Sequence, residues 1–170
     1  MTKKTMAAVV MGAFLVINAE AYMVSFMLIE TGLPEGVRKV HSEQWENTLF
    51  DVFFDSGFIT SNIAMQRLDY KPQNGVDGFL EANIVQLKNG GSDFFLIVQL
   101  DYGPEGATPE NISFYLYKIS QRGNIHALSA NGYASQKIFT EKIEGKKYRS
   151  SRDEIADIKK TAMGLVPYFK

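Results

Sequence analysis

FFLIVQL, residues 94–100, is a nearly unbroken apolar run that stands between Gly91 and Gly103. Its length suits a β-strand, and the lack of polar alternation is typical of a strand covered on both faces. The flanking glycines mark turns at its two ends. Residues 94–100 are therefore predicted to form a buried strand of a central sheet, with other elements packed on both of its faces.

The segments that follow this run predict two more strands. Apolar and polar residues alternate over residues 112–117, so this strand should have two distinct faces. Residues 121–124, Gln-Arg-Gly-Asn, have the composition of a hairpin turn, which should lead into a strand from Ile125 to about Ala134. The most basic stretch, Lys137 to Arg152, is interpreted as a solvated linker.

The best helix start signal lies near the carboxyl end. Ser151 and Glu154 have the spacing of a capping box, in which each side chain bonds a free backbone N–H of the other residue. Apolar residues then recur at helical spacing: Ile155, Ile158, Ala162, Leu165 and Phe169. This apolar face should pack on the sheet.

Two strands and two helices are predicted before residue 94. Aromatic and branched residues over 22–29 predict a first strand, and a short second strand is predicted over 58–61. A helix from Ser42 to Gly57 should lie between them. Residues 69–78 are interpreted as a loop. A second helical face leads from it toward Gly90: Val76, Leu80, Ile84 and Leu87.

The element order is therefore β-α-β-α-β-β-β-α. It predicts a single domain of the α/β (α+β) class, in which three helices pack on a mixed β-sheet of about five strands. Strands separated by helices can be parallel, whereas strands joined by short turns should be antiparallel.

The first 21 residues have the three parts of a cleavable secretory signal peptide. Lys3 and Lys4 give a positive start, residues 6–17 are apolar or small, and Ala19-Glu20-Ala21 fits the small-x-small cleavage pattern. The apolar run is shorter than the roughly 20 residues that span a bilayer. We expect cleavage after Ala21, a mature domain over residues 22–170 without a transmembrane segment, and a periplasmic or secreted location.

Charge and cysteine content narrow the class of protein. The 18 Lys and Arg residues nearly balance the 19 Asp and Glu residues, so no surface for nucleic acid or for an anionic membrane is expected. The chain has no cysteine, although small secreted domains often rely on disulfides. An exported domain that is held by its core alone favours a bacterial envelope over a eukaryotic secretory pathway.

Three segments, taken with the element order, resemble a known group of bacterial proteins. A helix closes on a glycine before a short strand at DSGFI (55–59), a second helix runs into GSDFFL (91–96), and a hairpin over 112–129 precedes the final helix. These segments look like the periplasmic domains of the CsgG, LpoB, FlgO and TolB amino-terminal type, over most of residues 42–166. The resemblance implies a role in envelope assembly and supplies no catalytic residues. Many such proteins are lipoproteins, and the missing cysteine departs from that pattern.

A search for chemistry in the sequence finds no catalytic or metal motif. G-x-S-x-G, H-E-x-x-H, the P-loop pattern and cysteine-based metal pairs are all absent. His41 and His126 are the only histidines, and neither has a nucleophile nearby in the sequence. Asp51 and Asp55 share a helix face, but two carboxylates are too few for calcium, and a solvated face is the preferred interpretation. We predict a protein that is not an enzyme and has no cofactor or metal.

Two groups of residues are candidates for contacts. Residues 101–106 follow the buried strand and could line a ligand crevice at its carboxyl end, although a Gly-Pro turn also explains them. Tyr115, Tyr117 and Tyr102 form a possible interaction surface, since a tyrosine ring ends in a hydroxyl that tolerates water. Alternatively, the final helix covers Tyr115 and Tyr117, which would make them core residues.

Three hypotheses for the function remain open. The first is an exported, non-catalytic envelope assembly or protein-interaction module with an envelope protein as partner, and an open sheet face or edge would favour it. The second is a periplasmic binding protein for a lipid, glycan or small ligand, which an enclosed apolar pocket would favour. The third is a hydrolase with an unrecognised site, which requires a histidine with a bonded carboxylate and a facing hydroxyl.

Amino-terminal sequencing of the exported protein tests the signal peptide. We expect the mature chain to begin at Tyr22, because cleavage should follow Ala19-Glu20-Ala21. Retention of residues 1–21 on a periplasmic or surface form would contradict cleavage. A cytoplasmic location of the full chain would contradict export.

Overall fold

The computed structural model describes residues 21–32, 40–69, 72, 75–103, 108–120 and 134–169. The elements follow the predicted order and are β1 (Met23–Thr31), α1 (Val40–Asp55), β2 (Ile59–Leu68), α2 (Asp77–Asn89), β3 (Phe94–Tyr102), β4 (Pro109–Ser120), β5 (Ala134–Glu144), α3 (Ser151–Leu165) and the 3-10 helix η2 (Val166–Phe169). The prediction of a single mixed α/β domain with five strands and three helices is confirmed.

The five strands form one mixed sheet in the order β2-β1-β3-β4-β5. β1 lies parallel to both β2 and β3, whereas β3, β4 and β5 are joined in antiparallel fashion. α1 connects β1 to its parallel neighbour β2, and α2 connects β2 to β3 on the far side of β1, so that all three strands run in the same direction. β2 and β5 are the two edges of the sheet.

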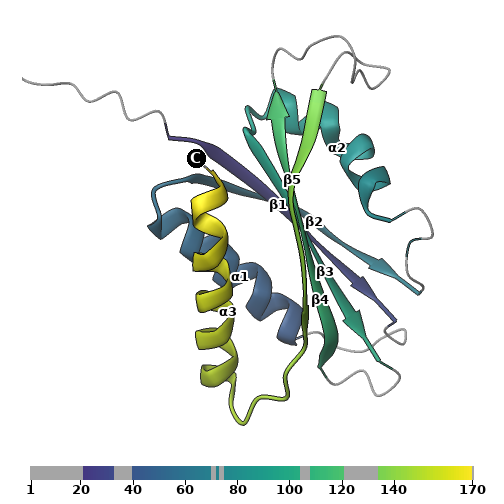
Figure 1. Cartoon of the computed structure of the whole chain (residues 1–170), viewed down its shortest axis with the longest axis vertical. Helices are drawn as coiled ribbons and strands as arrows, with labels where there is room; N and C mark the ends of the chain where they lie inside the picture. The colour runs from purple at the N-terminus through teal and green to yellow at the C-terminus, as the bar shows by residue number, and fades with distance from the viewer. Residues whose placement is uncertain are drawn as a thin grey trace, which may run out of the picture.

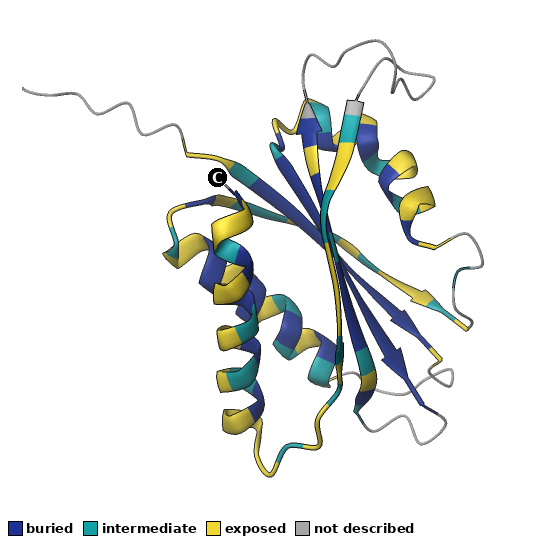
Figure 2. Cartoon of the chain, viewed as in Figure 1, coloured by how far each residue is buried: buried dark blue, intermediate teal, exposed yellow. Residues whose placement is uncertain are grey.

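Helices cover both faces of this sheet, and β3 lies between them (Figure 1). α1 and α3 pack side by side on one face, and α2 packs on the other. Every residue of β3 is buried, so the prediction of a strand covered on both faces is confirmed (Figure 2). The predicted apolar face of α2 is buried as well: Val76, Leu80, Ile84 and Leu87.

An aromatic cluster around Phe169 closes the larger core. The Phe169 ring makes edge contacts with Phe53, Phe58 and Phe94 at centroid distances of 5.0, 5.3 and 5.5 Å. Phe169 belongs to η2, Phe53 to α1 and Phe94 to β3, and Phe58 directly precedes β2. Edge-to-face pairs of this kind stabilise a core beyond the area that they bury. The carboxyl-terminal segment is thereby tied to α1 and to the centre of the sheet.

The interpretation of Lys137 to Arg152 as a solvated linker is wrong over its first half. Residues 134–144 form β5, an edge strand that pairs with β4. Phe139 and Ile143 pack against the core, while Lys137 and Glu141 are exposed. An edge strand buries few side chains and often carries charges that discourage pairing with other chains. Its composition therefore resembles that of a linker.

Two boundaries also differ from the predictions. β2 continues to Leu68, well beyond the predicted end at residue 61. α3 is capped by Ser150 and not by Ser151, because the Ser150 hydroxyl accepts a bond from the backbone N–H of Asp153 at 3.2 Å. Glu154 is buried and bonded elsewhere, so it does not close the predicted capping box.

Some predictions lie outside the described residues. These are the signal peptide up to residue 20, the hairpin turn and the predicted strand up to residue 133, His126, and residues 104–106 of the predicted crevice. Within the described ranges, no helix is long and apolar enough to span a membrane.

Substitution of Phe169 tests the link between the carboxyl end and the core. Phe169→Ala should lower the free energy of unfolding by about 3–5 kcal/mol, because it removes a fully buried ring. Met163→Ala is the control, since Met163 lies on α3 with 56% of its surface exposed and should change stability by less than about 0.5 kcal/mol. Equal urea midpoints for the two variants would contradict the packing of η2.

Candidate functional site

The predicted tyrosine surface is not a continuous exposed patch. Tyr117 is 2% exposed and Tyr102 is 8% exposed, so both belong to the core, and only Tyr115 is half-buried. The alternative that a helix covers Tyr117 is right, but the covering helix is α2 and not the final helix. Tyr102 faces the opposite layer, in the core formed with α1 and α3. These rings therefore do not form a shared binding surface.

Tyr117 instead anchors α2 to the sheet. Its hydroxyl donates to Asp77 in the first turn of α2, and Lys137 of β5 bonds the same carboxylate at 2.8 Å. The Lys137 ammonium also lies over the rings of Tyr115 and Tyr117, at 5.7 and 5.3 Å from their centroids. The bonds from Lys137 and Tyr117 hold the pKa of Asp77 below its usual value. This cluster ties three elements together and is structural.

Buried polar residues gather near the carboxyl ends of β1 and β3, where ligands bind in many open α/β sheets. Asp101 accepts hydrogen bonds from the Thr31 hydroxyl at 2.6 Å and from the Gln99 amide at 2.7 Å. On the other face, the hydroxyls of Tyr102 and Ser42 are 2.7 Å apart. Burial raises the pKa of Tyr102 to about 12, so its hydroxyl stays protonated. Both faces of this edge are thus held by buried polar contacts.

A histidine and a carboxylate also meet beside this edge. His41 Nδ1 lies 2.7 and 2.8 Å from the two carboxylate oxygens of Glu154, which is 2% exposed. The His41 side chain is 28% exposed, so the imidazole bridges solvent and the buried carboxylate. The neighbouring hydroxyl, Ser42, bonds Tyr102, so the described contacts do not align it on the imidazole. The pair links the first turn of α1 to the first turn of α3.

Acidic residues elsewhere in the described ranges do not gather into a metal site. Asp51 and Asp55 are both exposed on α1. No group of three or more His, Cys, Asp or Glu side chains in the described part of the chain could hold a metal ion.

A groove between β5 and α3 is the main candidate site. It has a volume of about 600 Å³ and continues along the edge strand to η2. Its apolar lining comes from Phe139 and Ile143 on one wall and from Tyr168 on the other. The Phe139 and Tyr168 rings are 4.4 Å apart at their centroids. Gly164 adds no side chain to the helical wall, and a Cβ built there meets nothing within 4 Å.

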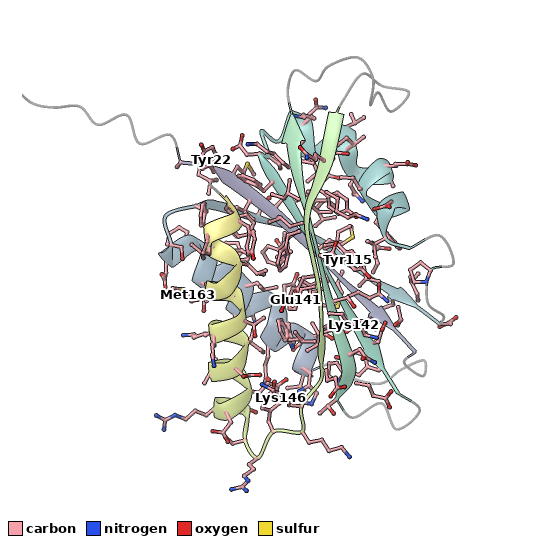
Figure 3. The ribbon with its side chains drawn as sticks, viewed as in Figure 1. Tyr22, Tyr115, Glu141, Lys142, Lys146 and Met163 are labelled. Atoms are coloured by element: carbon pink, nitrogen blue, oxygen red, sulfur yellow. The ribbon has the colours of Figure 1, made fainter. Side chains whose placement is uncertain are left out.

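Charged side chains line the same groove. Lys146 bonds both oxygens of Asp157 at 2.9 Å, and the Tyr148 hydroxyl donates to that carboxylate at 2.8 Å. The bond from Lys146 is the main reason why the pKa of Asp157 lies below its usual value. Glu141 extends from β5 toward α3, and Lys142 points to the opposite side of the sheet (Figure 3). The groove therefore combines apolar residues on both walls with the Glu141 carboxylate on its strand wall.

β5 adds backbone hydrogen-bonding groups to this groove. Within the described sheet it has a neighbour, β4, on one side only. Every second N–H and C=O group of such an edge points away from the sheet and can pair with another strand. The site was not predicted from the sequence, because residues 137–152 have the composition of a linker; the apolar residues Phe139 and Ile143 among charges are a weak signal of a strand.

Comparison with known proteins identifies a family. The model of a family described as "Uncharacterised protein" matches residues 32–158, which is most of the chain. The chain belongs to this family. The matched range begins directly after β1 and includes α1, α2, the other four strands and the first half of α3. No protein with a curated description matches the sequence.

Two similar solved structures are dodecamers of PelC from Paraburkholderia phytofirmans. One has 11% sequence identity and a TM-score of 0.46, and covers 82% of this chain and 84% of PelC. The other, a variant with one substitution, has 12% identity and a TM-score of 0.44, and covers 86% of this chain and 87% of PelC. At these values neither activity nor assembly is transferred from PelC to this chain.

Substitution of Tyr117 tests its assignment to the core. Tyr117→Ala should destabilise the domain by about 3–5 kcal/mol, as expected for truncation of a buried ring. Tyr117→Phe keeps the ring and loses only the bond to Asp77, so its loss should be clearly smaller. Thermal and urea unfolding measure both. A Tyr117→Ala variant as stable as the parent would contradict the assignment of Tyr117 to the core.

Proposed function

We propose that this chain is an exported, non-catalytic interaction module of a bacterial envelope, which binds a protein partner along β5 and the β5–α3 groove. The observation that carries the proposal is a strand that has a neighbour on one side only within the described sheet and that runs beside a groove with apolar and charged lining. The signal-like first 21 residues support export. The resemblance to periplasmic assembly domains supports the envelope as the location.

The shape of the groove favours a polypeptide over a compact ligand. Pockets for small molecules enclose most of the surface of the ligand. This groove is open along one side and follows an edge strand of 11 residues. A polypeptide segment can use both the free backbone groups of the strand and the apolar lining beside it.

A lipid, glycan or small ligand is the second candidate, because about 600 Å³ is enough space for a small molecule. A hydrolase is less favoured by the described contacts. His41 and Glu154 do not line the groove. Their pair satisfies a buried carboxylate, which would be costly to leave unpaired.

The proposal is tested by comparing how much envelope protein the mature chain, residues 22–170, captures with the groove open and with the groove blocked. Gly164→Trp should fill the groove and reduce capture at least tenfold, because the new side chain projects into open space. Gly78→Trp is the matched control, since Gly78 is exposed on α2 and also has nothing within 4 Å of a built Cβ. The measurement is quantitative mass spectrometry of crosslinked partners.

The two variants give distinct outcomes. Loss of the same partners with Gly164→Trp and their retention with Gly78→Trp would support the groove as the partner site. Equal capture by both variants would contradict it. Recovery of a lipid or glycan from the parent, and not from Gly164→Trp, would favour the second candidate.

A further inference from the structure

We infer that the β5–α3 groove recognises an extended segment of a partner protein that adds a strand to β5 and places a basic side chain, flanked by apolar ones, on Glu141. This inference rests on the function proposed above and specifies the chemistry of the partner. It follows from the alternation of side chains along β5 and from the charges on the two walls of the groove.

The pairing of β5 with β4 fixes which side chains face the groove. Phe139, Glu141 and Ile143 stand opposite Leu116, Phe114 and Ile112. The three β4 residues belong to the core shared with α1 and α3, and residues opposite each other in a sheet share a face. Along the strand wall of the groove, an apolar side chain is therefore followed by an acidic one and then by a second apolar one.

The Glu141 carboxylate lies on the strand wall of the groove. It makes no salt bridge within the described part of the chain, whereas Lys146, the basic residue at the end of the groove, is held by Asp157 at 2.9 Å. With that pair neutralised, the other charged residues of the lining are Glu141, Glu144 and Lys160. The excess is negative and lies on the strand wall, so a basic side chain of the partner is electrostatically favoured there.

Strand addition would align such a side chain. A strand that pairs with β5 projects every second side chain over the groove, at the spacing of Phe139, Glu141 and Ile143. The helical wall leaves room for these side chains at Gly164, and Tyr168 offers an aromatic surface. The partner segment is therefore expected to have the five-residue pattern apolar-x-(Lys or Arg)-x-apolar, in which x is any residue.

A second copy of this chain could pair with β5 through either edge strand of its own sheet, β5 or β2. Neither strand places a free basic side chain between apolar ones. A β5–β5 pair centred on Glu141 would bring two carboxylates together. β2 offers Arg67 as its basic residue, and Arg67 is held by the buried Glu30 at 3.1 Å. The pattern therefore favours a different protein as the partner.

Synthetic peptides test the inference directly. The probe is a labelled, end-capped peptide Thr-Val-Thr-Lys-Thr-Val-Thr, whose fluorescence anisotropy is followed on addition of the mature chain at low salt. Replacement of Glu141 by Gln should weaken binding about threefold, and Glu141→Lys about tenfold, because the second change adds repulsion to the lost attraction. Lys142→Gln is the matched control on the opposite face of β5, and it should leave binding unchanged or slightly tighter.

Two changes in the peptide separate side-chain from backbone recognition. A peptide with Glu in place of Lys should bind Glu141→Lys better than it binds the parent. Alternate backbone amides of a strand point to opposite edges, and only one edge of an added strand faces β5. N-methylation of the amides on that edge should therefore abolish binding, whereas N-methylation of the amides on the opposite edge should leave it intact.

The inference is overturned by any of three results with the peptides. These are no detectable binding of the lysine peptide at millimolar protein, binding that does not respond to Glu141→Lys, or binding insensitive to methylation of either edge. Self-association of the parent that Gly164→Trp abolishes would assign the edge to a second copy and would also overturn it. If Gly164→Trp still blocks envelope partners while the peptide results fail, the proposed function stands without this chemistry.

Discussion

β3 is apolar on both of its faces, and the arrangement of the other elements follows from the need to keep both faces out of water. A strand of this kind requires a covering layer on each side of the sheet. The chain provides the layers in turn, because α1 and α3 occupy one side and α2 the other. The Phe169 cluster and the bond from Tyr117 to Asp77 hold one layer each. With α3 packed against α1, the space left between α3 and the edge strand is the groove.

The periodicity of apolar residues in the sequence predicts helices and strands that bury one face or both faces. It does not predict elements that bury only a few side chains. β3 and the apolar face of α2 could be read from the sequence because each buries a regular set of residues. β5 could not, because its exposed residues give residues 137–144 the composition of a solvated segment. The cap of α3 was missed by one residue, since Ser150 and Ser151 both stand before an acidic residue at the right spacing.

The candidate site depends on contacts that no local pattern encodes. Alternation correctly places Tyr115 and Tyr117 on one face of β4, but which helix covers that face depends on the topology. His41 and Glu154 are 113 residues apart in the chain and meet only because α1 and α3 pack together. The groove joins a strand and a helix whose facing residues are polar enough to suit solvent, so the sequence gives little sign that they share a site.

The position of β1 has a consequence for the kinetics of folding. β1 lies between β2 and β3, so each of its neighbours in the sheet is synthesised after it, and its register joins Val24 to Phe94. The Met23 backbone N–H likewise donates to Asp93, 70 residues later. Topologies dominated by such non-local pairs fold more slowly than helical bundles, because the loop must close before the pairing stabilises it. A chain with this topology remains unfolded for longer after synthesis, which would suit the export that we propose for it, because translocation would precede folding.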